Sequence, residues 1–190
     1  TGQCVANLAK ALDIQVITSR RKITMKGADI EFDSNENRIP NANSLNKVTH
    51  LLSCIPPSID GTDPVLSKLK NHIVDMPLQW AGYLSTTGVY GDCKGQWVSE
   101  EHPVNPYQER SKRRLACEKS WEASGLPVQI LRLPGIYGPG RSALSSVLNK
   151  DCQMVDKPNQ VFSRIHVEDI AGAIFHLINL ASEGIKPPII

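Results

Sequence analysis

Candidate strands alternate with helical patterns along this chain, and this alternation limits the possible folds more than any other feature. The candidate strands are 14–18, a segment that ends at 31–33, 48–54, 82–86 and 128–133. Apolar residues recur at helical spacing over 1–12 and 63–74. A long helix is also expected to begin with Asn105 as its N-cap and Pro106 at its first position. This order predicts parallel βαβ units with helices on both faces of one sheet.

The fold class that follows is α/β, a doubly wound parallel sheet of the Rossmann type. With 190 residues, of which 41% are hydrophobic, the chain is long enough for one such domain, so we expect residues 1–190 to form a single domain. A sheet of this type has a strand before its first helix. No candidate strand precedes the helix predicted at 1–12, so we expect the first strand to be missing from this chain.

Composition argues against several classes of partner. The chain has 21 Lys and Arg and 19 Asp and Glu, spread along its length, so we expect no surface for nucleic acid. Its five cysteines include no Cys-x-x-Cys pair and its histidines have no metal-like spacing, so we expect neither disulfides nor a metal site. No segment is long and apolar enough to cross a bilayer. We therefore expect a cytoplasmic protein with no membrane partner.

Ligands of doubly wound sheets bind beyond the carboxyl ends of the strands. Gly2 begins the first predicted helix, whose amides and dipole favour the binding of a pyrophosphate. A glycine before a helix is also common where it has no functional role. Ser19 and Arg20 end the next predicted strand, where NAD-preferring sites carry an acidic residue. A guanidinium matches a phosphate, so we expect NADP(H) to be favoured over NAD(H), unless the arginines here only solvate the strand end. The following strand ends add the expected cofactor contacts Asp33, Ser53 and Ile55.

Three segments resemble the motifs of one family. Residues 83–92 read Tyr-Leu-Ser-Thr-Thr-Gly-Val-Tyr-Gly-Asp, 131–140 read Leu-Arg-Leu-Pro-Gly-Ile-Tyr-Gly-Pro-Gly, and 164–171 read Arg-Ile-His-Val-Glu-Asp-Ile-Ala. In this order they are similar to motifs of the extended short-chain dehydrogenases/reductases, and most similar to the atypical subgroup of NAD(P)-dependent epimerases and dehydratases. The resemblance implies that Pro134 contacts the cofactor and that residues 137–165 begin a partial C-terminal substrate lobe. It also makes a homodimer one expected assembly.

The resemblance implies a catalytic set that this chain has only in part. Thr86 matches the Ser/Thr at the end of the fourth strand, and Lys112 matches the lysine that holds the nicotinamide ribose. Gln108 replaces the tyrosine expected one helical turn before the lysine, and a carboxamide has no proton that titrates in a useful range. Tyr107 is the neighbouring candidate acid, although in a regular helix it would face away. Further candidate proton donors are Tyr90, Asp92 and Glu109.

Two functions from different classes follow. The first is an NADP(H)-binding oxidoreductase or epimerase that acts on a small molecule, with a sugar nucleotide as one candidate. The alternative is a non-catalytic NADP(H)-binding sensor or scaffold that has lost the catalytic tyrosine. A generic α/β domain of another function is a third hypothesis, which the three ordered motifs disfavour.

Overall fold

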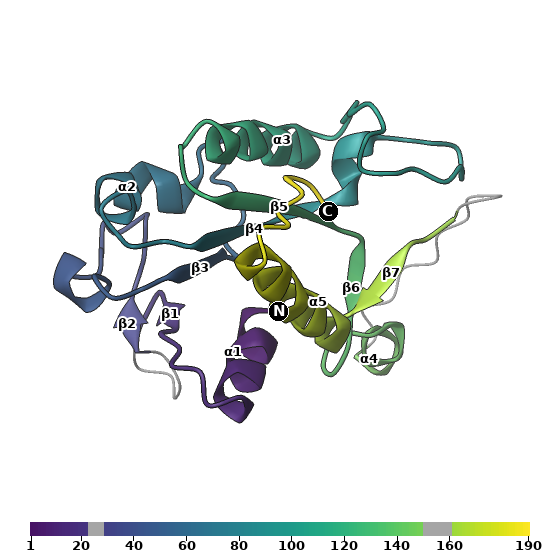
Figure 1. The fold of residues 1–190 in the computed structure, drawn as a ribbon. Coiled ribbons are helices and arrows are strands. Elements are labelled where there is room, and N and C mark those ends of the chain that lie inside the picture. The colour runs from purple at the N-terminus through teal and green to yellow at the C-terminus, as the bar shows by residue number, and fades with distance from the viewer. Residues whose placement is uncertain (23–28, 150–160) are drawn as a thin grey trace.

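The computed structural model describes residues 1–22, 29–149 and 161–190 (Figure 1). Its central sheet contains β3 (His50–Ser53), β4 (Trp80–Thr86) and β5 (Val128–Leu133), hydrogen-bonded in that order and parallel. A separate parallel pair is formed by β1 (Ser19–Arg20) and β2 (Ile30–Glu31). The last residues extend the central sheet, because the Ile130 amide donates to the Pro188 carbonyl oxygen at 2.8 Å and Ile189 pairs with β5 in parallel.

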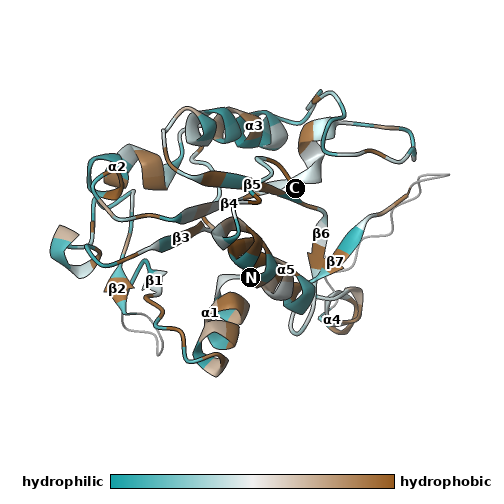
Figure 2. Ribbon diagram, viewed as in Figure 1, coloured by the Kyte–Doolittle hydropathy of each residue, from teal (hydrophilic) through white to brown (hydrophobic). Residues whose placement is uncertain are grey.

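Helices cover both faces of the central sheet. On one side lie α2 (Pro64–Ile73) and α3 (Glu109–Glu122), and on the other α1 (Gly2–Ala11) and α5 (Val167–Ser182) (Figure 1). In β4, Ala81 and Tyr83 belong to the core beneath α2 and α3, whereas Trp80 and Leu84 pack with α5. Because successive side chains of a strand point to opposite faces, β4 is apolar on both (Figure 2). The predicted doubly wound α/β fold is confirmed.

Gly82 makes this two-sided packing possible at the centre of β4. A Cβ built on Gly82 would lie 2.2 Å from Cη2 of Trp80, so the indole lies directly over the glycine. Nε1 of Trp80 donates to Oε1 of Gln129 on β5 at 2.5 Å, and Nε2 of Gln129 donates to the Pro187 carbonyl oxygen at 2.9 Å. These bonds satisfy polar groups inside the core and hold the C-terminal segment against β5.

The predicted helix over 63–74 is confirmed as α2. Oδ1 of Asp63 accepts from the amides of Val65 and Leu66, at 2.9 and 3.0 Å, and Pro64 occupies the first turn. An Asp at the N-cap and a Pro in the first turn are common features of a helix start. The strand predicted at 128–133 also has the bounds of β5.

Two predicted elements need correction. The strand predicted over 14–18 is wrong, since only Ser19 and Arg20 pair with a neighbour, and Ile14 and Ile17 are 47% and 45% exposed. Of these residues Thr18 has hydrogen-bonded neighbours, because its carbonyl oxygen accepts from the amides of Asp29 and Ile30 at 2.9 and 3.1 Å, but the ladder with β2 begins only at Ser19. The predicted N-cap Asn105 is also wrong, because α3 begins at Glu109 with Gln108 as its N-cap. The Asn105 amide instead donates to the Val89 carbonyl oxygen at 3.0 Å.

The predicted start of the substrate lobe contains a second parallel pair. β6 (Gly135–Tyr137) lies beside β7 (Arg164–His166), and α4 (Ala143–Leu148) lies between them in the chain. Residues 150–160 of this lobe, with Cys152, lie outside the described residues. Short 3₁₀ turns are η1 (Ala42–Ser44) and η2 (Thr87–Tyr90). No helix in the described ranges is both long and apolar enough to span a membrane.

Candidate functional site

The amino end of α1 lies against the carboxyl end of β3. A Cβ built on Gly2 would lie 3.4 Å from Sγ of Cys54, the residue after β3. The Thr1 side chain makes no capping hydrogen bond to α1, so no side-chain cap at the N-cap position satisfies the first amides of this helix. These amides and the positive end of the helix dipole are therefore available to an anion.

Arg20 reaches the same corner from β1. Its Nη2 donates to Oε1 of Gln3, in the first turn of α1, at 2.9 Å. Ser19 is exposed at the adjacent position of the strand. The corner where α1 begins therefore holds both the helix amides and a guanidinium, two groups that bind phosphate oxygens.

The other predicted cofactor residues differ in what they can offer. Ser53 is 3% exposed, and its Oγ has no hydrogen-bond partner within the described parts of the chain. The Ile55 carbonyl oxygen accepts from Nη1 of Arg114 at 3.4 Å. Asp33 closes a turn, because its Oδ1 accepts from backbone amides and its Oδ2 from Arg38 at 3.1 Å. Of these three residues, Ser53 has the polar atom that lacks a partner.

Thr86 ends β4 and caps η2. Its Oγ1 accepts from the Gly88 amide at 3.1 Å, and the hydroxyl hydrogen is still able to donate to a substrate oxygen. A Cβ built on Gly88 would lie 2.8 Å from Oγ of Ser111 and 3.4 Å from Oγ1 of Thr86. The glycine thus lets the first turn of α3 approach Thr86 closely. Pro134 lies near the same end of the sheet, since it follows Leu133, the partner of Thr86 on β5.

Lys112 follows Ser111 in α3, but its ammonium pairs with a neighbour on the same helix. Nζ donates to Oε1 of Glu109 at 2.7 Å, and the Lys112 side chain is 52% exposed. The hydrogen bond from Lys112, and then its charge, lower the pKa of Glu109 below the ordinary value. Glu109 is therefore a carboxylate at neutral pH, which argues against it as a proton donor.

Tyr107 and Gln108 are in contact just before α3 begins. Nε2 of Gln108 donates to the phenol oxygen of Tyr107 at 3.0 Å, and Nε of Arg110 donates to Oε1 of Gln108 at 2.7 Å. Residue 107 lies outside the helix, so the expectation that Tyr107 faces away, which assumed a helix there, no longer applies. The Tyr107 phenol lies next to the side chain that replaces the expected tyrosine, and it is exposed.

A buried polar network beneath the site was missed from the sequence. Arg132 of β5 and Glu118 of α3 form an ion pair, with Nη2 of Arg132 2.8 Å from Oε2 of Glu118. Ser85, next to Thr86, donates to Glu118, and Nη1 of Arg132 donates to the phenol oxygen of Tyr90 at 3.1 Å. Tyr90 is thus part of the packed interior. A charged residue within the apolar strand 128–133 was the available signal, because a buried charge requires a partner.

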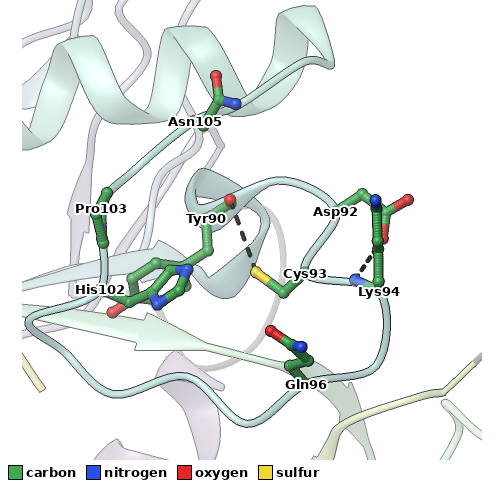
Figure 3. A pocket seen from close by; sticks show the side chains of 8 residues that line it. All are labelled: Tyr90, Asp92, Cys93, Lys94, Gln96, His102, Pro103 and Asn105. Atoms are coloured by element: carbon green, nitrogen blue, oxygen red, sulfur yellow. Dashed lines mark hydrogen bonds between the residues drawn. The ribbon is translucent and has the colours of Figure 1, made fainter.

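A hollow of about 460 Å³ opens in the loop between η2 and α3 (Figure 3). Asp92 and Lys94 line one side of it, and the rings of Tyr90 and His102 lie on the other. Oδ1 of Asp92 accepts from the Lys94 amide at 2.9 Å, so this carboxylate also closes a turn. The remaining lining residues are Cys93, Gln96, Pro103 and Asn105. The hollow lies in one loop and contains none of the residues predicted to contact the cofactor.

A family model for the "NAD dependent epimerase/dehydratase family" matches residues 45–190, which is more than half of the chain. The chain belongs to this family. The family assignment confirms the resemblance drawn from the three motifs. The matched segment includes the central sheet, Thr86, α3 and the predicted start of the substrate lobe.

Two relatives of this epimerase/dehydratase chain have no stated activity. Protein YeeZ of Escherichia coli (strain K12) is 36% identical over 104 residues, which cover 54% of this chain and 36% of that protein. A functionally unknown conserved protein from Silicibacter pomeroyi has a structure with a TM-score of 0.80 and 36% identity, covering 98% of this chain and 66% of that one. The chain therefore matches only about a third to two thirds of the length of these relatives.

A second solved structure shows the fold alone. MoeE5 in complex with UDP-glucose and NAD has a TM-score of 0.76 and 18% identity, and the match covers 99% of this chain and 70% of that one. The Rossmann-type arrangement is therefore shared with a protein that holds both a dinucleotide and a sugar nucleotide.

The residues of this epimerase/dehydratase chain fit a dinucleotide. Ser53, whose buried Oγ has no partner among the described residues, ends the strand beside Gly2 at the amino end of α1. An uncapped helix terminus and a guanidinium lie at the adjacent corner. Donor groups of this kind suit the phosphates of a dinucleotide, and Thr86 offers a hydroxyl farther along the same edge.

Proposed function

We propose that this protein is an NADP(H)-dependent oxidoreductase or epimerase that acts on a small molecule, with a sugar nucleotide as the first candidate. The observation that carries the proposal is the 2.9 Å hydrogen bond between Arg20 and Gln3, which joins a guanidinium to the first turn of α1. An arginine at this position matches a 2′-phosphate, which NADP(H) has and NAD(H) lacks. The family description and the UDP-glucose of MoeE5 support the class of reaction and substrate.

In this proposal, residues along the carboxyl edge of the sheet bind different parts of the dinucleotide. The amides at Gly2 bind the pyrophosphate, Ser19 and Arg20 bind the 2′-phosphate, and Ser53, Ile55 and Pro134 line the rest of the dinucleotide site. Asp33 stays a proposed contact at the next strand end, although its carboxylate closes a turn and its amide donates to the Arg38 carbonyl oxygen at 2.9 Å. The bound dinucleotide supplies the group that accepts or donates a hydride.

The proton transfer is assigned to Tyr107. Its phenol can exchange a proton with the substrate oxygen, whereas Gln108 cannot. The Thr86 hydroxyl donates to the same substrate oxygen and orients it. Lys112 leaves Glu109 to bind the nicotinamide ribose and brings a positive charge close to the reacting atoms.

A non-catalytic sensor of NADP(H) is the second candidate, and two observations favour it. Gln108 occupies the position of the expected acid, and Lys112 is paired with Glu109. Such a protein would bind the dinucleotide at the same edge and transmit its presence to a partner.

Nucleotide binding and turnover separate these candidates. The whole purified protein is titrated with NADPH and NADH, and then assayed against a panel of sugar nucleotides and carbonyl compounds. We expect tighter binding of NADPH, turnover of at least one substrate, and its loss in Tyr107→Phe, with Gln108→Tyr as a comparison variant. NADPH binding without turnover across the panel would favour the sensor, and equal affinities would remove the NADP(H) preference.

The proposal also includes the cellular location and the oligomeric state. We place the protein in the cytoplasm, because its five cysteines are widely spaced and include no Cys-x-x-Cys pair, which suits a reducing compartment. A homodimer is one candidate assembly, and light scattering on the purified protein tests it.

A further inference from the structure

Gln3 makes the contact that directs the side chain of Arg20. Its Oε1 accepts from Nη2 of Arg20 at 2.9 Å, and its Nε2 donates to Oδ1 of Asn7 at 2.9 Å. Gln3 and Asn7 are four residues apart in α1, so they share a face of the helix. Figure 1 shows α1 beside β1. The bond to Asn7 turns the Gln3 amide so that its oxygen faces the guanidinium.

This contact holds Arg20 without neutralising it. Gln3 is uncharged, and the carboxylates of Glu31 and Asp33 lie 3.6 and 3.1 Å from the guanidinium of Arg38. A guanidinium has five N–H donors, and the bond to Gln3 uses one of its three nitrogens. Among the described residues, Arg20 is paired with no carboxylate, and it retains further donors for an anion.

We infer that Gln3 is a positioning residue that holds Arg20 in the orientation that receives the 2′-phosphate of NADP(H). The inference rests on the proposed NADP(H) preference and names the residue through which α1 supports it. A side chain that is already held by a partner loses less rotamer freedom when a ligand binds. Gln3 therefore strengthens the binding of NADPH without touching its phosphate, and NADH, which lacks this phosphate, gains nothing from it.

Dissociation constants for NADPH and NADH test the inference on the whole purified protein, by calorimetric titration. Gln3→Leu removes the acceptor, and we expect NADPH affinity to fall roughly three- to ten-fold while NADH affinity stays within about two-fold. Gln3→Glu puts a carboxylate beside Arg20 that competes with the phosphate, so its loss for NADPH is expected to be larger. Gln79→Leu is the matched control, because Gln79 is exposed and precedes β4 at the opposite end of the sheet.

The outcomes separate this inference from the proposed function. Arg20→Leu is expected to abolish the preference for NADPH. If it does so while both Gln3 variants keep the wild-type ratio of the two affinities, Gln3 has no positioning role and the inference is overturned alone. If the wild-type protein binds NADPH and NADH with equal affinity, both the proposed NADP(H) preference and the proposed role of Gln3 are wrong. A loss of NADH binding in Gln3→Leu equal to the loss of NADPH binding also overturns the inference, since it indicates a general effect on α1.

Discussion

Arg132 and Glu118 form an ion pair of 2.8 Å in which the two side chains are only 5% and 1% exposed. The pair joins β5 to α3. Ser85 also donates to Glu118 from β4, directly before Thr86. The helix that carries Lys112 is therefore attached, through one buried carboxylate, to the strand that carries Thr86. This attachment sets the relative positions of two residues that the proposed function needs together.

We predict that Glu118→Leu lowers the free energy of unfolding by about 3–5 kcal/mol, because it leaves the Arg132 charge buried without its partner. Urea denaturation followed by circular dichroism measures this. Glu109→Gln in the same helix is the control, since it breaks only the exposed pair with Lys112, which solvent screens, and is expected to leave the free energy of unfolding nearly unchanged. The double variant Glu118→Leu/Arg132→Met should regain much of the loss. Similar costs for the buried and exposed pairs would contradict this assignment.

Gly82→Ala tests the packing at the centre of β4. The new methyl group would lie 2.2 Å from Cη2 of Trp80, so the indole must move within a filled core. We predict a loss of at least about 2 kcal/mol in unfolding free energy. Gly172→Ala in α5 is the matched control, because a Cβ there meets nothing within 4 Å, and a gain of up to about 1 kcal/mol is expected. Thermal denaturation of both variants measures these changes in stability. A Gly82→Ala variant as stable as the wild type would contradict the packing of Trp80 over Gly82.

Asp63 should give the fold a measurable pH dependence. Burial raises the pKa of its carboxyl, although amide hydrogen bonds from Leu66 and Val65 oppose the shift. Because the folded pKa exceeds the unfolded one, the contribution of this group to stability is full below the unfolded value of about 3.9 and is lost as pH rises through the folded value. Asp63→Asn keeps the capping oxygen and removes the charge. Its stability relative to the wild type is therefore predicted to be higher at pH 7 than near pH 4, by urea denaturation at both. The opposite trend would show that the cap stabilises the charged form.

Glu109→Gln should tighten the binding of the dinucleotide if Lys112 has to leave Glu109 to reach it. The pair is exposed and weak, so NADPH affinity is expected to rise by no more than about five-fold at low ionic strength. The gain should shrink in high salt, which screens the pair in the wild-type protein. Lys112→Met is expected to weaken binding at either ionic strength. Titrations that show no change in Glu109→Gln would mean that Lys112 stays with Glu109 in the bound state.

Elements with strong local signals were predictable. A short apolar run predicts a strand and a capped amphipathic segment predicts a helix in almost any context. The strand at 128–133 and the helix at 63–74 were therefore predicted from the sequence. The strand over 14–18 failed because pairing depends on a neighbour that local sequence does not specify. The N-cap at Asn105 failed for a similar reason, since Asn followed by Pro is a good helix start, but the Asn105 amide is bound to Val89 of η2.

The amino-acid sequence by itself determined the class of fold, the family motifs and the residue types along the carboxyl edge of the sheet, because these depend on local periodicity and spacing. Only the tertiary structure decided which side chains meet there. It joined Arg20 to Gln3 and Ser111 to Gly88 beside Thr86. The physical reason is that such contacts depend on where α3 starts and how the helices pack on the sheet. Both are set by long-range burial and hydrogen bonding, and not by the residues next to each site.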